Sequence, residues 1–331
     1  MTAHWDPATL LETSGSYWQG AALQAGVRLD IFTTLSDASL PADSLAKLLD
    51  CDERSLAMLL RALTAMDLLV KDRVGYRCPE PLCYWLDKNS GQYLGNIIRH
   101  QHHLMESWGR LDQAVQTGKP QRQHSSHDEQ EWREDFLLGM HNLSHLLAPQ
   151  LVPLLPLQNP KKLIDIGGGP GTWALHFCQQ YPELQATVFD LPSSETIFQQ
   201  NVAKNVMAER VRFVGGDFLH QPIGNGFDTA WLSHVLHGES PANAATLIKH
   251  AAAALISGGT LMIHEFILSD HTQGPLYPAL FSLNMLLGTE QGQSYSELEL
   301  EQMCQAAGLE EITRIGLPAQ IKSGVLCAQK P

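Results

Sequence analysis

Residues 165–171 read Asp-Ile-Gly-Gly-Gly-Pro-Gly and constrain the fold of this chain more than any other segment. They stand between an apolar run at residues 162–166 and a run with helical spacing at residues 173–181. Glycine has no Cβ, so its backbone can approach a ligand where any other side chain would obstruct it. Such a turn between a strand and a helix is typical of sheets that bind ligands at the carboxyl ends of their strands. The segment therefore predicts an α/β domain with a binding site at this turn.

From about residue 155 onward, short apolar runs alternate with helical segments. This alternation predicts a Rossmann-like, doubly wound, mostly parallel sheet that helices cover on both faces. The predicted strands are residues 162–166, 186–190, 211–214, 229–232 and 260–264, followed after a helix at 296–307 by two strands near 311–315 and 325–328.

The first part of the chain has the element order of a winged helix. Residues 40–49 and 53–63 predict two helices, and residues 68–77 predict two short strands around a turn. Winged helices often bind DNA through their second helix, but here that helix, counted with Asp52 before it, carries two acidic residues (Asp52, Glu53) and two basic ones (Arg54, Arg61) and so has no net positive charge. The sequence therefore favours a structural or dimerising role for this part over DNA binding.

We expect three segments along the chain. Residues 1–95 would form a helical, winged-helix dimerisation domain, residues 96–155 a helical linker, and residues 156–331 the catalytic domain with the sheet. Four prolines between positions 149 and 160 predict the end of the helical segment, because proline breaks helices.

The charge of the chain narrows the classes of partner. Among its 331 residues, 22 are basic and 35 acidic, which gives a formal net charge of −13. Nucleic acids and anionic lipid surfaces bind clustered Lys and Arg, so neither is an expected partner. No apolar stretch approaches the roughly 20 residues of a spanning helix, and the N-terminus lacks the pattern of a secretory signal. We therefore expect a cytoplasmic protein.

The spacing of cysteine and histidine predicts no metal site. The six cysteines form no CxxC pair, as expected of reduced cytoplasmic thiols. The run Arg-His-Gln-His-His at residues 99–103 would place its histidines on different faces of a helix, with no carboxylate at ligand spacing.

An acidic residue after the second predicted strand indicates a ligand that carries a nucleoside. Asp190 follows Gly171 by 19 residues, at the position that typically binds ribose hydroxyls. Nicotinamide dinucleotides use a similar corner, but their fingerprint is G-x-G-x-x-G, and here Thr172 stands where its last glycine would be. The observed glycine spacing fits poorly with a diphosphate, so a nicotinamide-dependent oxidoreductase is the less favoured alternative. Titration with a nicotinamide dinucleotide and with S-adenosylmethionine would distinguish the two interpretations, because only one of these cofactors should bind.

The glycine turn resembles the D-x-G-x-G-x-G motif of class I methyltransferases, which bind S-adenosylmethionine. Later segments narrow the resemblance to the plant-type O-methyltransferase family, often called family 2. These segments are residues 189–192 (Phe-Asp-Leu-Pro), 215–218 (Gly-Gly-Asp-Phe), 232–237 (Leu-Ser-His-Val-Leu-His) and 258–260 (Gly-Gly-Thr), with residues 26–32 and 59–63 matching the family's dimerisation domain. The resemblance covers nearly the whole chain and implies a homodimer.

The resemblance implies that S-adenosylmethionine is the cofactor and assigns residues to its parts. The three odd-numbered glycines of the turn would lie beside the methionine part and Asp190 on the ribose. Asp217 and Phe218 would lie at the adenine, because a carboxylate can accept from the exocyclic amine and an aromatic ring can stack on the purine. Core packing is the alternative for Phe218. The implied cofactor-binding residues are Asp165, Gly167, Gly169, Gly171, Asp190, Leu191, Asp217, Phe218 and Ser233.

The resemblance also implies the catalytic pair. His237 would be the general base, and Glu265, at the end of the fifth strand, would orient it. Histidine suits this role because its reference pKa of about 6.5 leaves a neutral ring that accepts a proton at pH 7. The implied residues around the small-molecule acceptor are Phe136, Met140, Asn142 and His234. Core packing would explain the first two equally well.

Proton affinity limits the acceptor. Moving a proton from a phenol of pKa about 10 to a histidine costs roughly 5 kcal/mol, and from a thiol of pKa about 8.5 roughly 3 kcal/mol. An unactivated alcohol, with a pKa near the 15.7 of water, would cost roughly 12 kcal/mol. We therefore expect a phenol, enol or thiol, with a phenolic or enolic hydroxyl as the first choice.

Departures from the family pattern leave the methylated atom open. The usual His-Asp-Trp reads His237-Gly238-Glu239, the family's second acid aligns with Ser294, and Glu290 lies four positions out of register. Transfer to sulfur, carbon or nitrogen is therefore an alternative to transfer to oxygen. A winged-helix regulator that senses a nucleoside is the non-enzyme alternative.

Overall fold

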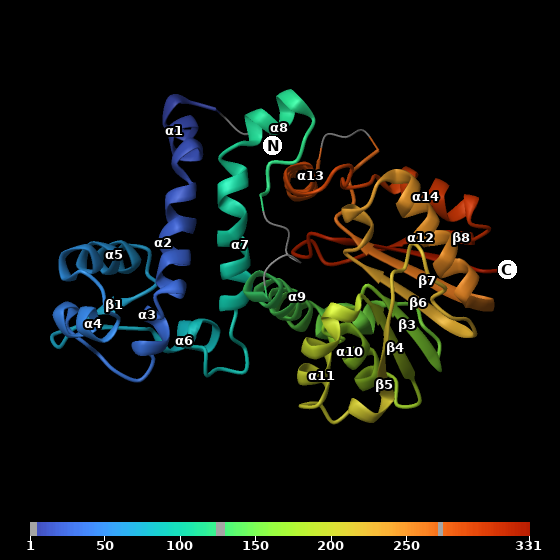
Figure 1. Cartoon of the computed structure of the whole chain (residues 1–331), viewed down its shortest axis with the longest axis horizontal. Coiled ribbons are helices and arrows are strands. Elements are labelled where there is room, and N and C mark those ends of the chain that lie inside the picture. Colours follow the sequence, from blue (N-terminus) through green and yellow to red (C-terminus); the bar gives the residue numbers. More distant parts are fainter. Residues whose placement is uncertain (1–4, 124–129, 271–273) are drawn as a thin grey trace. The chain divides into compact units, whose positions relative to one another are not determined.

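The computed structural model describes residues 5–123, 130–270 and 274–331. The chain divides into two compact units, with the division between Leu104 and Met105 (Figure 1). The second unit thus takes in most of the segment 96–155. The functional division into three segments stays a prediction.

The first unit contains helices around one short hairpin. Its elements are α1 (Pro7–Gly15), α2 (Tyr17–Arg28), α3 (Ile31–Thr34), α4 (Ala42–Leu48), α5 (Glu53–Ala65), β1 (Val70–Lys71), β2 (Tyr76–Arg77), α6 (Glu80–Leu86) and the start of α7 (Gly95–Trp108). Asp52 caps α5 by accepting the N–H of Ser55, and α5 buries leucines at helical spacing. β1 and β2 pair antiparallel. The order α4, α5, hairpin is the predicted winged-helix order.

The second unit contains, among its described residues, one seven-stranded sheet. Its strands are β3 (Lys162–Ile166), β4 (Gln185–Asp190), β5 (Val211–Gly215), β6 (Phe227–Ser233), β7 (Leu255–Glu265), β8 (Glu310–Ile315) and β9 (Gly324–Gln329). They lie in the order β5-β4-β3-β6-β7-β9-β8, and β9 is the strand that runs opposite to the other six. The predicted fold class, an α/β unit with a mostly parallel sheet, is confirmed.

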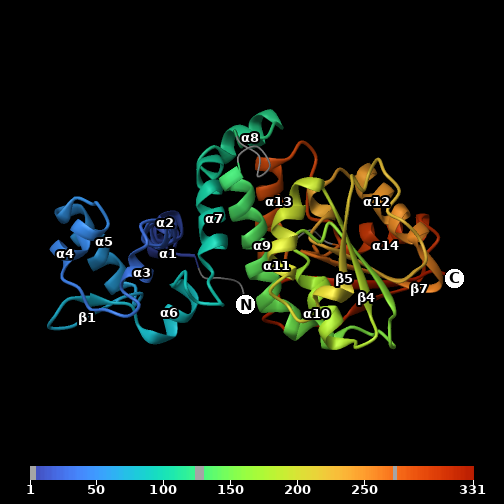
Figure 2. The same ribbon diagram turned by 60° about the horizontal axis from the view of Figure 1, so that its bottom comes forward.

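Helices cover both faces of this sheet (Figures 1 and 2). They are α9 (Gln130–Leu151), α10 (Thr172–Gln180), α11 (Glu195–Val202), α12 (Pro241–Ala254) and α14 (Glu297–Ala306), while α8 (Leu111–Thr117) and α13 (Leu276–Gly288) pack against each other. α9, α10 and α11 pack on one face, and α12 and α14 on the other. Successive strand residues alternate between these two cores. On β6, Trp231 packs under α10, while Ala230 and Leu232 pack under α12.

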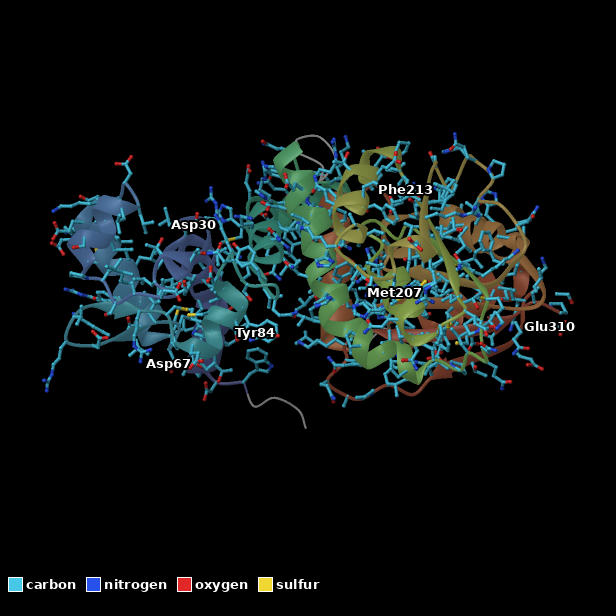
Figure 3. All side chains as sticks on the ribbon, turned by 90° about the horizontal axis from the view of Figure 1, so that it is seen from below. Asp30, Asp67, Tyr84, Met207, Phe213 and Glu310 are labelled. Atoms are coloured by element: carbon cyan, nitrogen blue, oxygen red, sulfur yellow. The ribbon has the colours of Figure 1, made fainter. Side chains whose placement is uncertain are left out.

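Side chains fill the space between the sheet and its helices (Figure 3). Phe213 on β5 and Met207, both labelled there, pack against the core under α9, α10 and α11. No helix among the described residues combines the length and apolar character of a membrane span.

The predicted end of the helical segment is close to the observed one. α9 includes Pro149 and ends at Leu151, within the proline-rich stretch at residues 149–160 that the sequence marks as the boundary. Proline removes one backbone N–H, but in the last turn of a long helix that loss is small because packing holds the turn. Leu151 is fully buried in the core beside α10.

The order in which the strands are connected indicates where a ligand would bind. From β3 the chain continues to β4 and β5 on one side and then returns to β6 on the other side. The neighbours β3 and β6 therefore form the topological switch point, outside which ligands bind in open α/β sheets.

Candidate active site

The strand register brings the predicted site residues to one edge of the sheet. Ile166, the last residue of β3, pairs with Phe189 of β4 and with Leu232 of β6. Ser233 pairs with His264 near the end of β7. Asp190 and Glu265 end β4 and β7, and the segments after β3 and β6 hold the glycine turn and the two histidines, His234 and His237.

The glycine turn requires glycine for two different reasons. Gly167, Gly169 and Gly171 have φ angles of 72°, 49° and 74°, in the left-handed region that side chains disfavour. A Cβ on Gly167 would also lie 2.6 Å from Val235, and one on Gly171 would lie 2.7 Å from a ring atom of Phe198. At Gly169 the nearest atoms are 3.5 Å away or more, so only its backbone conformation requires glycine. This leaves a bare backbone at the carboxyl end of β3.

Asp165 lies beneath this turn with an unsatisfied carboxyl group. It is fully buried, and neither carboxyl oxygen has a hydrogen-bond partner among the described residues. Burial, and secondarily the charge of Asp190, raises the pKa of Asp165 to about 8. An orphaned acceptor beside a bare glycine backbone fits a ligand that brings a cationic or N–H group, such as the amino group of S-adenosylmethionine.

Asp190 holds the glycine turn in place. One carboxylate oxygen accepts the N–H of Gly169 at 2.7 Å. The other accepts the N–H of Leu191 at 2.6 Å and the hydroxyl of Ser194 at 2.9 Å. Leu191 is partly exposed directly after β4. Asp190 therefore stabilises the loop at the position where the sequence predicts a ribose.

The predicted adenine residues lie in the turn after β5. Asp217 is half-exposed, and its carboxylate accepts the N–H of Leu219 and lies 2.9 Å from Nδ1 of His220. Phe218 packs against the core beside α12, and its carbonyl accepts from Nδ1 of His250. The core-packing alternative for Phe218 thus holds in part, and its contact with adenine stays a prediction.

Ser233 forms a hydrogen bond to a histidine that sequence reasoning missed. Its hydroxyl lies 2.9 Å from Nδ1 of His264, whose Nε2 lies 2.7 Å from the hydroxyl of Ser323. His264 is fully buried, and burial lowers its pKa well below the usual value, so the ring is neutral. The sequence carried no signal of the hydrogen bonds of His264, because the residue stands in an ordinary strand segment.

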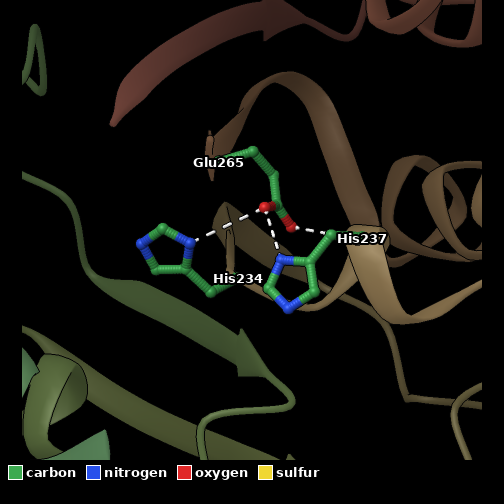
Figure 4. Close-up of side chains that lie close together, drawn as sticks. All are labelled: His234, His237 and Glu265. Carbon is green, nitrogen blue, oxygen red and sulfur yellow. Dashed lines mark hydrogen bonds and ion pairs between the residues drawn. The ribbon is translucent and has the colours of Figure 1, made fainter. Parts of the chain in front are cut away.

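His237 and Glu265 form the central pair of the site (Figure 4). His237 lies in a short 3-10 turn, η4 (Leu236–Gly238), after β6, and Glu265 is the last residue of β7. Nδ1 of His237 is 2.8 Å from Oε2 of Glu265, and the backbone N–H of His237 donates to Oε1 at 3.4 Å. The carboxylate is 3% exposed and the imidazole 14%. The predicted pair is therefore in contact and largely shielded from water.

The charge of Glu265 fixes the tautomer of His237. Burial by itself raises the pKa of Glu265, but the attraction of His237, its hydrogen bond and the nearby His234 outweigh burial and hold the pKa well below its usual range. An ionised carboxylate only accepts hydrogen bonds, so Nδ1 of His237 carries the proton. In the neutral ring Nε2 is then the free proton acceptor.

His234 lies against the same carboxylate. Its Nδ1 is 3.6 Å from Oε2 of Glu265, which is an ion-pair distance but too long for a hydrogen bond, and the atom is buried without a partner among the described residues. His234 has a left-handed backbone, with φ of 56°, and its ring packs 4.3 Å from the rings of both His264 and Phe266. A non-glycine residue in this conformation is uncommon and often marks a functional site.

An aromatic cluster adjoins the pair and was not predicted. Phe281 on α13 meets the His237 ring edge-on at 4.7 Å, and Phe266 lies 4.6 Å from Phe281 and 4.9 Å from Tyr277. Two signals in the sequence could have found it. Phe266 directly follows Glu265, and the two other rings stand four residues apart on one helix.

α9 brings the predicted acceptor residues toward the glycine turn. Leu137 would be 3.5 Å from a Cβ on Gly169, and Nδ1 of His141 is 2.8 Å from the hydroxyl of Thr172 at the start of α10. On this helix Phe136 and Met140 are half-buried and share a face, and Asn142 is buried. Their contact with an acceptor stays a prediction.

Ser294, which stands where the family has its second acid, has a structural role. Ser294 is buried and donates its hydroxyl to the carbonyl of Pro278, while Glu290 is exposed. Tyr295 donates its hydroxyl to the carbonyl of Glu239 at 2.6 Å. Among the described residues, Glu265 is therefore the carboxylate that pairs with His237.

Comparisons with known proteins identify the family. The family model of the O-methyltransferase domain matches residues 108–310, and that of the O-methyltransferase dimerisation domain matches residues 11–86. The chain belongs to the O-methyltransferase family. Membership confirms the methyltransferase prediction over the nicotinamide-dependent oxidoreductase, and S-adenosylmethionine is the cofactor.

Individual relatives of this O-methyltransferase are similar over nearly their whole length. The 3-hydroxy-5-methyl-1-naphthoate 3-O-methyltransferase of Streptomyces sahachiroi is 28% identical over 98% of this chain and 95% of its own. The N,N-dimethyltransferase OxyT of Streptomyces rimosus is 26% identical over 88% of both. The solved structure of PigF with SAH superimposes with a TM-score of 0.89 at 25% identity, covering 98% of this chain and 100% of that one.

Proposed function

We propose that this O-methyltransferase methylates the hydroxyl group of a planar small molecule, a phenol or an enol, with His237 as general base. The observation that supports this most is the buried Glu265 carboxylate 2.8 Å from Nδ1 of His237. This contact leaves Nε2 as the proton acceptor, on the side of the ring away from Glu265 (Figure 4).

The donor, when bound, supplies a methyl group on a cationic sulfur. Asp165 and the glycine turn would hold its amino acid part, Asp190 its ribose, and Asp217 with Phe218 its adenine. When the acceptor oxygen bonds to the methyl carbon, the carbon–sulfur bond would break and S-adenosylhomocysteine would leave, while Nε2 of His237 takes the hydroxyl proton. The Glu265 carboxylate stabilises the resulting imidazolium, because opposite charges in a shielded site attract strongly.

The surroundings of His237 support a flat acceptor. Phe266, Tyr277 and Phe281 gather beside the imidazole and offer ring faces and edges for stacking. Together with Phe136, Met140, Asn142 and His234 they would form the acceptor site.

The methylated atom has one alternative that a relative favours. OxyT is named an N,N-dimethyltransferase, so transfer to nitrogen, and by extension to carbon or sulfur, is the second candidate on the same site. The position of the new methyl group in the product separates these candidates.

The first unit would join two copies of the chain. None of the nine residues of α1 is buried, and Leu11, Tyr17 and Trp18 on α1 and α2 are 75%, 61% and 70% exposed. Such an apolar surface typically marks an interface, and it lies within or next to the matched dimerisation domain. A homodimer would cover it.

A cytoplasmic location is part of the proposal. All six cysteines are free thiols, as is usual in a reducing compartment.

The test uses the full chain with S-adenosylmethionine and a panel of phenols, hydroxynaphthoates, amines and thiols. We expect S-adenosylhomocysteine and a methyl ether as products. His237→Ala should lower turnover by about 100- to 10,000-fold without changing donor affinity in calorimetry. Near-normal turnover in this variant would refute the mechanism. Donor binding without methylation of any acceptor would instead favour the nucleoside-sensing regulator.

A further inference from the structure

The ligand atoms of His234, His237 and Glu265 lie within 4.8 Å of one another. They come from the loop after β6 and from the end of β7 (Figure 4). Two imidazole nitrogens and one carboxylate oxygen form a set that Zn²⁺ and related divalent ions bind readily. We infer that this cluster reversibly binds a divalent transition-metal ion and that the bound ion inhibits methyl transfer.

Two of the three ligand distances are near those of a tetrahedral ion, and the third, between the two imidazole nitrogens, is at most 4.8 Å and closes by up to about 1.4 Å when the rings turn toward the ion. With metal–ligand bonds of about 2.0–2.2 Å, neighbouring ligand atoms stand roughly 3.4 Å apart. The 3.6 Å between Nδ1 of His234 and Oε2 of Glu265 already fits. The 2.8 Å between Nδ1 of His237 and Oε2 must open by about 0.6 Å, as expected when an ion replaces a hydrogen bond.

Nδ1 of His234 has no hydrogen-bond partner among the described residues. The atom is buried and faces the carboxylate. A buried polar atom without a partner costs free energy, and a metal ion would satisfy it. The packing of the ring between His264 and Phe266 limits other orientations.

Inhibition follows from the tautomer of His237. In the metal-free pair Nδ1 carries the proton and Nε2 is the base. An ion at Nδ1 takes the place of that proton, which moves through solvent to Nε2, so the ring stays neutral. Nε2 then carries hydrogen and cannot accept the proton of the acceptor. The inhibitory half of this inference rests on the proposed function, whereas metal binding does not.

The site differs from the histidine run at residues 99–103 that the sequence draws attention to. Its histidines stand three residues apart in a loop, and its carboxylate is 28 residues further along. Only the pairing of β6 with β7 brings them together.

The binding test titrates Co²⁺ into tag-free full-length protein without donor, and follows the visible absorption of the ion. We expect one ion per chain, displaced by Zn²⁺, without the near-ultraviolet band of thiolate ligands. His234→Ala and His234→Gln should each lower Co²⁺ affinity about 10-fold or more. His220→Ala, which removes an exposed histidine of the same unit, should leave it unchanged. The glutamine variant keeps a polar side chain, and circular dichroism confirms that the variants fold.

Two outcomes overturn metal binding: no absorption beyond that of free Co²⁺, or equal affinity in wild type and both His234 variants. Inhibition is tested with Zn²⁺ in the methyl-transfer assay and should be reversed by EDTA. Binding without inhibition overturns the inhibitory half. If no acceptor is methylated, the proposed function fails, and the Co²⁺ titration still decides the metal site.

Discussion

Replacing Glu265 by glutamine tests how the catalytic pair is built. The carboxylate accepts two hydrogen bonds from His237, one from Nδ1 at 2.8 Å and one from the backbone N–H at 3.4 Å. An amide of the same shape offers only one accepting oxygen. If that oxygen faces Nδ1, the tautomer is kept but the imidazolium loses its negative partner. If the amide nitrogen faces Nδ1, the proton moves to Nε2 and the base is lost.

The expected size of the effect follows from the lost charge. A hydrogen bond to a charged group contributes about 1.5–3 kcal/mol, and here the partner becomes charged only as the proton is transferred. At about 1.36 kcal/mol per factor of ten, Glu265→Gln should lower kcat by about 10- to 150-fold. If the wrong tautomer dominates, the loss is larger.

The assay measures kcat and KM for the acceptor at saturating S-adenosylmethionine, with donor affinity measured by calorimetry. We expect kcat to fall while donor affinity stays within about twofold. Glu310→Gln, which changes an exposed glutamate at the start of β8, is the matched control and should leave both values unchanged. Turnover of Glu265→Gln within about threefold of wild type would refute the reasoning.

Three further predictions concern stability and assembly. Because burial raises the pKa of Asp165 to about 8, the folded state holds a proton that the unfolded chain releases above about pH 4, so this residue lowers stability as pH rises from about 4 to 8. The melting temperature of Asp165→Asn minus that of wild type should therefore grow from pH 5 to pH 8, and a constant difference would contradict this. At Gly171, φ is 74° and an added Cβ would lie 2.7 Å from Phe198, whereas at Gly226 φ is 82° but the surrounding space is open. Gly171→Ala should therefore lower the free energy of unfolding in urea by about 1–3 kcal/mol more than Gly226→Ala does. Equal losses would show that backbone strain alone matters. Trp18→Lys should convert the dimer to monomers, as measured by light scattering. The control is Val206→Lys, at a position of the other unit that is 91% exposed, and it should leave the dimer intact. A dimer that persists in Trp18→Lys would place the interface elsewhere.

Much of the fold could be predicted because the pattern is local. Buried parallel strands are short apolar runs, and each predicted strand falls within an observed one, such as residues 260–264 within β7. The end of α9 at Leu151 also falls within the predicted proline-rich boundary, and only the inclusion of Pro149 in the helix depends on the tertiary packing of the buried Leu151.

The sequence predicted the two residues at the centre of the site but not the side chains around them. The contact of His237 with Glu265 was expected and is observed. The ring cluster of Phe266 and Phe281 and the buried His264 were not expected, because side chains on different elements meet only after folding.

By itself, the sequence determined the order of the strands along the chain, the glycine turn and the residue types of the catalytic pair, since strand pattern and the need for glycine at positive φ act over a few neighbouring residues. Only the tertiary structure decided that the ends of β6 and β7 lie side by side, so that one buried carboxylate meets His234 and His237 together. The physical reason is that distance through space depends on strand register. Register is set by the packing of both faces of the sheet, to which residues far apart in the sequence contribute.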